Sequence, residues 1–166
     1  GEYVATLADK APLYRAVIEK NWPGLGNRLV TRSSGLSLDL NGCNQVRDLT
    51  PMKGMLLTRL ELNHCPISNL TPLKGMPLTT LSFGDADVSD LTPLTGMPLK
   101  SLEFYENPVS DLTPLKGMLL TKLIFGQTDV TDLTPLKGMP LIELLLWGTT
   151  VSDLPPLKGM PLEKLA

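Results

Sequence analysis

The sequence predicts an α/β solenoid with a parallel sheet on its concave side, 3₁₀ or short helical turns on its convex side, and a helical cap at its N-terminus. Two observations predict this fold. The phrase Asp-Leu-Thr-Pro-Leu-Lys-Gly-Met recurs, with small changes, every 21 residues from Asp48 to Met160. Each repeat also contains Leu-x-Leu, whose period of two places both leucines on one face of a strand. A strict period of this length is typical of a chain whose coils stack on one another.

The repeated phrase predicts the turn on the convex side. Threonine is expected to cap the turn, proline to occupy its first position, and glycine to end it in a left-handed conformation. The first residue of each phrase should accept backbone hydrogen bonds, and the lysine should lie near the carboxyl end of the turn. We interpret the aspartate and lysine ladders as structural rather than as a calcium site or an anion track. The phrases begin at Asp48, Asn69, Asp90, Asp111, Asp132 and Asp153.

Residues 1–35 lack the repeat and are predicted to form an N-terminal cap of a helix and a hairpin. The helix is indicated by apolar residues at three- to four-residue spacing, and it should end at Asn21-Trp22-Pro23-Gly24. We expect Asp9 to cap it, with Pro12 in its first turn. The hairpin is expected to pair 29–31 with 36–38. The apolar positions of the helix are Leu7, Ala11, Tyr14, Val17 and Ile18.

Residues 36–166 form the predicted array of about six repeats and the start of a seventh. The stretch Leu57-x-x-Leu60-x-Leu62-x-x-Cys65-x-Ile67 fits the leucine-rich-repeat signature. The Asp-Leu-Thr-Pro-Leu half resembles the internalin-like class of bacterial leucine-rich repeats, and Leu-Lys-Gly-Met-Pro-Leu resembles repeat arrays of planctomycete-type bacterial proteins. This resemblance implies a right-handed leucine-rich-repeat solenoid, or horseshoe, used mainly for protein recognition.

Composition and motifs argue against several classes of function. The chain has a net charge of −2, from 15 basic and 17 acidic side chains, which argues against nucleic-acid binding. No apolar run approaches the ~18 residues of a membrane helix, so we expect no membrane insertion. No phosphate loop or catalytic triad is visible, and the single histidine, His64, has no acidic or nucleophilic partner at a recognisable spacing. We therefore expect no enzymatic activity and no cofactor.

Cysteine and methionine occupy fixed positions in the repeats. Cys43 and Cys65 both stand at the asparagine position of the signature, so stacked coils would bring them about 5 Å apart. We expect free, buried thiols rather than a disulfide or a zinc site shared with His64. The methionines are expected to fill the core. They are Met55, Met76, Met97, Met118, Met139 and Met160.

The outward positions of the strands vary from coil to coil, whereas the convex phrases are nearly identical. The first coils present polar and small residues, and the last three present aromatic and aliphatic residues beside charges, a composition typical of binding hot spots. We also expect Gly126 to leave a notch between Tyr105 and Trp147 that a partner side chain could enter. The predicted concave binding residues are Arg59, Glu61, Glu103, Tyr105, Lys122, Ile124, Glu143, Leu145 and Trp147.

The function predicted from these features is non-enzymatic recognition of a protein or peptide through the concave face, within a larger bacterial protein. The alternative is a structural array that self-associates through its C-terminal end. That alternative follows from the position of Leu165-Ala166 in the strand of a seventh coil without a polar cap, since unpaired strand edges favour pairing. Tyr105 and Trp147 distinguish the two hypotheses, because a recognition module should lose its ligand when they are replaced.

Overall fold

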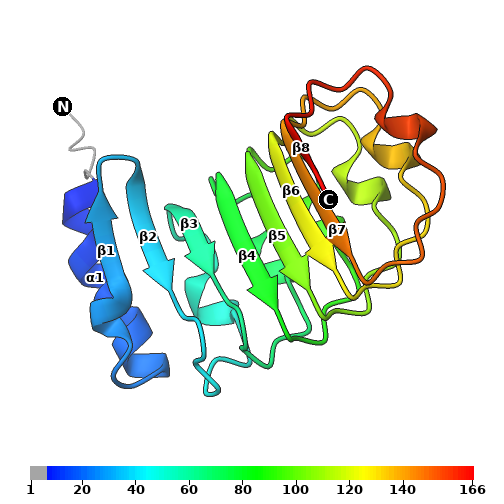
Figure 1. Cartoon of the computed structure of the whole chain (residues 1–166). Coiled ribbons are helices and arrows are strands. Elements are labelled where there is room, and N and C mark those ends of the chain that lie inside the picture. The colour runs from blue at the N-terminus through cyan, green and yellow to red at the C-terminus, as the bar shows by residue number, and fades with distance from the viewer. Residues whose placement is uncertain (1–6) are drawn as a thin grey trace.

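The computed structural model describes residues 7–166, with side chains from residue 9 onward, and it is an open solenoid (Figure 1). Residues 1–6 of the predicted cap and the side chain of Leu7 lie outside this description. One helix, α1, spans Leu7–Asn21. The strands are β1 Leu29–Arg32, β2 Gly35–Asp39, β3 Leu57–Glu61, β4 Thr80–Gly84, β5 Ser101–Tyr105, β6 Lys122–Gly126, β7 Glu143–Trp147 and β8 Lys164–Leu165. The 3₁₀ turns are Gly26–Arg28, Thr50–Met52, Thr71–Leu73, Thr92–Leu94, Thr113–Leu115, Thr134–Leu136 and Pro155–Leu157.

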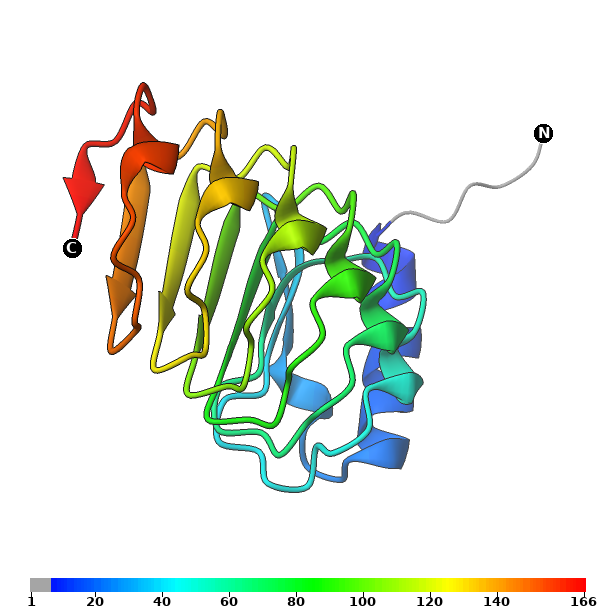
Figure 2. The ribbon, with the colours of Figure 1, turned by 90° about the vertical axis from the view of Figure 1, so that its right-hand side faces the viewer.

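The eight strands form a single sheet in chain order from β1 to β8. β1 pairs antiparallel with β2, and every later neighbour pairs in parallel. The sheet lines the concave side, and the 3₁₀ turns lie behind it on the convex side (Figures 1 and 2). The right-handed leucine-rich-repeat solenoid predicted from the 21-residue period is therefore confirmed.

The convex turn begins differently from the prediction, because threonine does not cap it. In the turn Thr71–Leu73, the capping position belongs to Leu70, which has no side-chain cap, and Thr71 is already the first residue of the turn. Its N–H donates to Oδ1 of Asn69 at 2.8 Å. The first residue of the phrase therefore supplies the capping oxygen two residues upstream. The same hydrogen bond recurs from Thr50 to Asp48, Thr92 to Asp90, Thr113 to Asp111, and Thr134 to Asp132.

These capping carboxylates explain the aspartate ladder. A hydrogen bond from the Thr113 hydroxyl, followed by one from the Thr113 N–H, lowers the pKa of Asp111 because both favour its charged form. The aspartates of the neighbouring coils share this cause. At the other end of the turn, Gly117 has φ +75°, the left-handed conformation expected for this position. The ladder therefore shapes the backbone, as the repeat pattern predicted.

The core consists of columns of identical or similar side chains, one from each coil. Phe83, Phe104 and Phe125 are fully buried on consecutive strands. Their rings stack with centroid separations of 5.7 and 5.5 Å and interplanar angles of 14° and 11°. The repeat methionines from Met55 to Met139 are also buried, whereas Met160 in the last coil is only half-buried. Because parallel pairing keeps the register, identical or similar residues fill the same layer of successive coils.

The helix begins earlier than the sequence suggested. α1 starts at Leu7, so Asp9 lies in its first turn instead of capping it, and Pro12 lies in its second turn. A carboxylate in the first turn still interacts favourably with the helix dipole, which accounts for the similar sequence signal. The buried side of the helix includes Ala11 and Ile18, and the hydroxyl of Tyr14 accepts the Leu56 N–H at 3.3 Å. Helix and hairpin thus cover the first coil.

Both cysteines are free and buried, as predicted. The Cys65 thiol donates to the Leu40 carbonyl oxygen at 3.0 Å, and the Cys43 thiol donates to the Asn41 carbonyl oxygen at 3.7 Å. Burial raises the pKa of Cys65 to about 11, because a thiolate is poorly solvated there. The two side chains therefore act as small core residues with protonated thiols.

Candidate binding surface on the concave sheet

The strand register aligns the variable outward residues into columns across the concave face. Glu103 pairs with Ile124, and Ile124 pairs with Leu145. Tyr105, Gly126 and Trp147 form the column at the carboxyl ends of these strands. Since the register has no shift from β3 to β8, one column repeats at every coil. The predicted binding residues therefore share one continuous surface.

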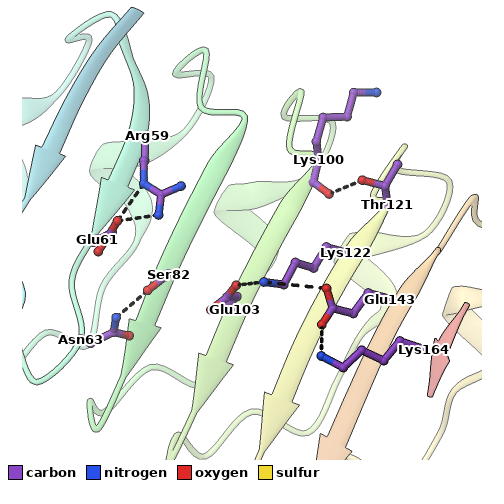
Figure 3. Close-up of polar contacts among 10 residues, drawn as sticks. All are labelled: Arg59, Glu61, Asn63, Ser82, Lys100, Glu103, Thr121, Lys122, Glu143 and Lys164. Carbon is purple, nitrogen blue, oxygen red and sulfur yellow. Dashed lines mark hydrogen bonds and ion pairs between the residues drawn. The ribbon is translucent and has the colours of Figure 1, made fainter. Parts of the chain in front are cut away.

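An alternating ladder of charges crosses this surface from β5 to β8 (Figure 3). Lys122 Nζ lies 2.6 Å from Glu103 Oε1 and 3.9 Å from Glu143 Oε2. Lys164 Nζ lies 2.8 Å from Glu143 Oε1. The hydrogen bond from Lys164 is the main cause of the lowered pKa of Glu143, with the charge of Lys122 contributing as well. Opposite charges on adjacent strands hold these side chains in place and leave little net charge.

A second polar cluster combines side chains of β3 and β4 with asparagines that follow β2 and β3. Arg59 Nε and Nη2 both lie 2.7 Å from Oε1 of Glu61. The other oxygen of Glu61 accepts the Asn41 amide at 2.7 Å. Asn63 Nδ2 donates to the Ser82 hydroxyl at 2.6 Å (Figure 3). These contacts fix the orientation of each side chain, and fixed side chains lose little conformational entropy when they form further contacts.

A polar hollow of about 230 Å³ lies between these two clusters. Small residues from the middle strands line it, including Thr80, Ser82 and Ser101. Arg59 and Glu61 border it with Asn63 toward the N-terminus, and Glu103 and Lys122 border it toward the C-terminus. The outward sequence of the strands contained these small residues, yet nothing in it indicated that charged side chains would enclose them.

The predicted notch at Gly126 is occupied by the protein's own Trp147, so that expectation is wrong. A Cβ on Gly126 would lie 2.3 Å from Cε2 of Trp147, and a Cβ on Gly84 would lie 2.2 Å from Cζ of Tyr105. Each aromatic side chain therefore covers the glycine of the preceding strand, an arrangement that protects glycine in a sheet. Tyr105 and Trp147 lie with ring centroids 6.3 Å apart at an interplanar angle of 35°.

We call Tyr105 and Trp147 the aromatic shelf. Trp147 is 44% exposed, and Tyr105 is half-buried, as are the neighbouring aliphatic residues Ile124 and Leu145. Burial raises the pKa of Tyr105, and the nearby charges of Glu106, Asp85 and Glu103 raise it further. The structure thus places the aromatic and aliphatic members of the predicted site together, in coils that also carry the charge ladder.

His64 has an acidic partner that sequence spacing alone did not reveal. Its Nδ1 lies 3.2 Å from Oδ2 of Asp85, which is one coil away, and its ring lies edge-on to Tyr105 with centroids 6.4 Å apart. Both partners of the pair are more than half exposed. The relevant spacing is the repeat length itself, because residues one period apart become neighbours in a solenoid.

Residues 7–166 show neither a metal-binding cluster nor a membrane-spanning helix. No cluster of three or more histidine, cysteine, aspartate or glutamate side chains with metal-binding geometry occurs there. None of the helical segments in that range has the length and apolar character needed to cross a bilayer.

Comparison with known proteins identifies the fold. No protein-family model matches the chain, and no curated protein matches it. Among solved structures, an internalin from Listeria monocytogenes matches 72% of this chain with a TM-score of 0.63 and 26% sequence identity. The chain spans 44% of the length of that internalin. Internalin C2 from the same organism matches 100% of this chain and 99% of its own length, with a TM-score of 0.65 and 22% identity.

The structural likeness agrees with the repeat sequence, the parallel concave sheet and the 3₁₀ turns on the convex side. This architecture is a scaffold typical of protein interaction. The chain therefore has the leucine-rich-repeat solenoid fold that is also found in these Listeria internalins.

Proposed function

We propose that the chain is a non-enzymatic recognition module that binds a protein or peptide on its concave face. The observation that carries this proposal is the aromatic shelf, where Trp147 is 44% exposed beside half-buried Tyr105, Ile124 and Leu145. Exposed aromatic residues next to aliphatic residues and charged pairs are typical of interface hot spots. The solenoid offers a broad curved surface of variable residues on an invariant scaffold, which suits recognition more than catalysis.

Selection of displayed random peptides on the wild-type chain tests this proposal. Each selected peptide is then measured against a Tyr105→Ser/Trp147→Ser variant whose fold is checked by circular dichroism. We expect a loss of affinity of at least about tenfold, since truncating a hot-spot aromatic residue costs roughly 2 kcal/mol or more. A matched control is Thr92→Ser, a small exposed change on the convex side. Equal affinity of all selected peptides for wild type and the double variant would refute the proposal.

Self-association through the last coil is the second candidate. β8 contains two residues at the edge of the sheet, and Leu154 and Leu165 nearby are each 49% exposed. Exposed strand edges and apolar residues favour pairing between copies. Light scattering over a dilution series tests it. Concentration-dependent mass that persists in Tyr105→Ser/Trp147→Ser but disappears in Leu154→Ser/Leu165→Ser would support this function, and a monomer at every concentration would contradict it.

A further inference from the structure

The loops beside the aromatic shelf carry carboxylates. Asp85 and Glu106 directly follow the strands β4 and β5, and their N–H groups donate at 3.0 Å to the carbonyl oxygens of Tyr105 and Gly126. Both residues therefore flank the backbone on which Tyr105 lies. Asp87 lies in the same loop as Asp85, whereas Asp129 lies in the loop that follows β6, and both are also exposed. We call these four residues, Asp85, Asp87, Glu106 and Asp129, the acidic rim.

Most carboxylates of the acidic rim have no cationic side chain near them. Among the described residues, no cation lies within ion-pair distance of Asp87, Glu106 or Asp129. Asp85 contacts His64, which carries a charge only when protonated. Glu103, the other carboxylate near the shelf, is already paired with Lys122. The surroundings of the shelf are therefore negative at neutral pH.

The amino ends of the strands, opposite the acidic rim, carry positive charge. The segments that lead into the strands carry exposed lysines and make this end of the sheet basic. The loops that follow β4, β5 and β6 carry the acidic rim at the other end. Figure 1 shows that these two sets of connections lie at opposite ends of the strands. The lysines are Lys53, Lys74, Lys100, Lys116, Lys137 and Lys158. The aromatic shelf lies at the same end of the strands as the acidic rim, because Tyr105 and Trp147 are the last residues of β5 and β7.

Aromatic faces and unpaired carboxylates together select a cation. The π-face of tryptophan or tyrosine attracts an ammonium or guanidinium group, and the attraction strengthens when the ring is partly desolvated. One face of each ring packs on the glycine of the preceding strand. The exposed part of the shelf therefore faces solvent beside the rim. A guanidinium stacked on the shelf could also donate to the rim carboxylates, which an uncharged side chain of equal size would do more weakly.

We propose that the aromatic shelf and the acidic rim form a subsite for an arginine or lysine side chain, so that the partner contributes a basic segment to the concave face. This inference rests on the proposed function and specifies the chemistry of its ligand. Charge complementarity argues for this occupant, because an acidic segment would meet repulsion from Glu106 and Asp85 at the same place.

The test uses three short peptides of equal length in which serine alternates with arginine, with citrulline or with glutamate. Citrulline keeps the size and planarity of arginine but removes its charge. Trp147 fluorescence reports binding, since Trp22 is buried. We expect the arginine peptide to bind at least about tenfold more tightly than the citrulline peptide, with an affinity that falls as salt rises. Equal affinity for citrulline, tighter binding of the glutamate peptide, or no measurable binding of the arginine peptide would overturn the inference.

Variants locate the subsite. Asp85→Asn/Glu106→Gln should weaken the arginine peptide several-fold without changing the fold. The matched control is Asp111→Asn/Asp132→Asn, which removes the same charge from the convex turns and keeps the capping amide that Asn69 already provides there. Equal loss in both double variants would contradict a local subsite. If displayed peptides require Tyr105 and Trp147 yet contain no basic residue, this inference fails and the proposed function stands. If no selected peptide requires them, the proposed function itself fails.

Discussion

Trp147 covers Gly126 on the adjacent strand, and the space that an alanine side chain would need at residue 126 is already occupied by the indole. The same relationship joins Tyr105 to Gly84 one pair of strands earlier. Glycine and aromatic residue therefore alternate along this column, and each glycine permits the next ring to lie flat on the sheet. The shelf depends as much on the two glycines as on the two rings.

Gly126→Ala should displace the indole of Trp147. The added Cβ would lie 2.3 Å from Cε2, far inside van der Waals contact, so the ring must move. We expect a red shift of Trp147 fluorescence, a loss of stability of about 1–2 kcal/mol, and loss of any ligand that depends on the shelf. Ser101→Ala in β5 is the control and should leave the fluorescence unchanged. An unshifted spectrum for Gly126→Ala would contradict the described packing.

Phe104→Leu should destabilise the fold more than Phe125→Leu. Phe104 stacks on an aromatic ring on both sides, whereas Phe125 stacks on Phe104 alone among the three core rings. Phe104→Ala should cost about 3–5 kcal/mol, as is usual for a buried phenylalanine. Urea unfolding followed by circular dichroism measures all three variants. Equal losses for the two leucine variants would show that stacking along the column adds nothing to burial.

Asp111→Ala should lower the melting temperature by a few degrees at neutral pH, because it removes the oxygen that caps the turn at Thr113. Asp111→Asn should retain most of this stability, as Asn69 does in its own coil. The sign of the pH effect follows from the lowered pKa of Asp111. The carboxylate contributes fully above its unfolded pKa, and its contribution disappears as pH falls through the folded pKa. The difference in melting temperature between wild type and Asp111→Ala should therefore shrink in acid, and a constant difference would be the contrary result.

Gln127→Gly should stabilise the fold by roughly 0.5–1 kcal/mol. Gln127 has φ +49°, and the equivalent positions His64, Asp85 and Glu106 are also left-handed, whereas the next coil has glycine at residue 148. A side chain in this left-handed conformation costs about 1–2 kcal/mol. Glycine removes that cost, but it also makes the unfolded chain more flexible, so the net gain in stability is smaller. Gln127→Val should destabilise by about 1–2 kcal/mol because a branched Cβ is least compatible with this backbone. Thermal unfolding of both variants checks the prediction, which requires shifts of opposite sign.

Cys65 should not react with a thiol reagent at pH 8 in the folded protein. Its pKa is raised to about 11 by burial, so the reactive thiolate is scarce as well as inaccessible. Reaction should appear when urea unfolds the chain. Because a thiol with a raised pKa keeps its proton in the native state, its contribution to stability is present below the usual thiol pKa and is lost as pH rises toward 11. Rapid labelling of Cys65 in native buffer would show that this region opens; Cys65→Ala separates its signal from that of Cys43.

The local sequence pattern was sufficient to predict the fold, because every coil repeats the same strand and turn motifs. The 21-residue period, the Leu-x-Leu strands and the Thr-Pro-Leu turns all favour the same structure. Because the coils stack in parallel, this consistency between local preferences recurs in each of them. The register of outward residues also followed from this period. The prediction that threonine caps the turn was wrong by only two residues, since the oxygen that caps the turn at Thr71 belongs to Asn69.

The binding surface depended on side-chain packing between coils, which no period encodes. Trp147 lies over Gly126, and His64 meets Asp85, because parallel pairing brings residues of adjacent coils into contact. Whether a glycine forms a notch or supports a neighbouring ring depends on the rotamer of that ring, and rotamers respond to the whole neighbourhood. The amino-acid pattern was therefore enough for the scaffold and its columns, while the shelf, the hollow and the charge ladder required the assembled coils.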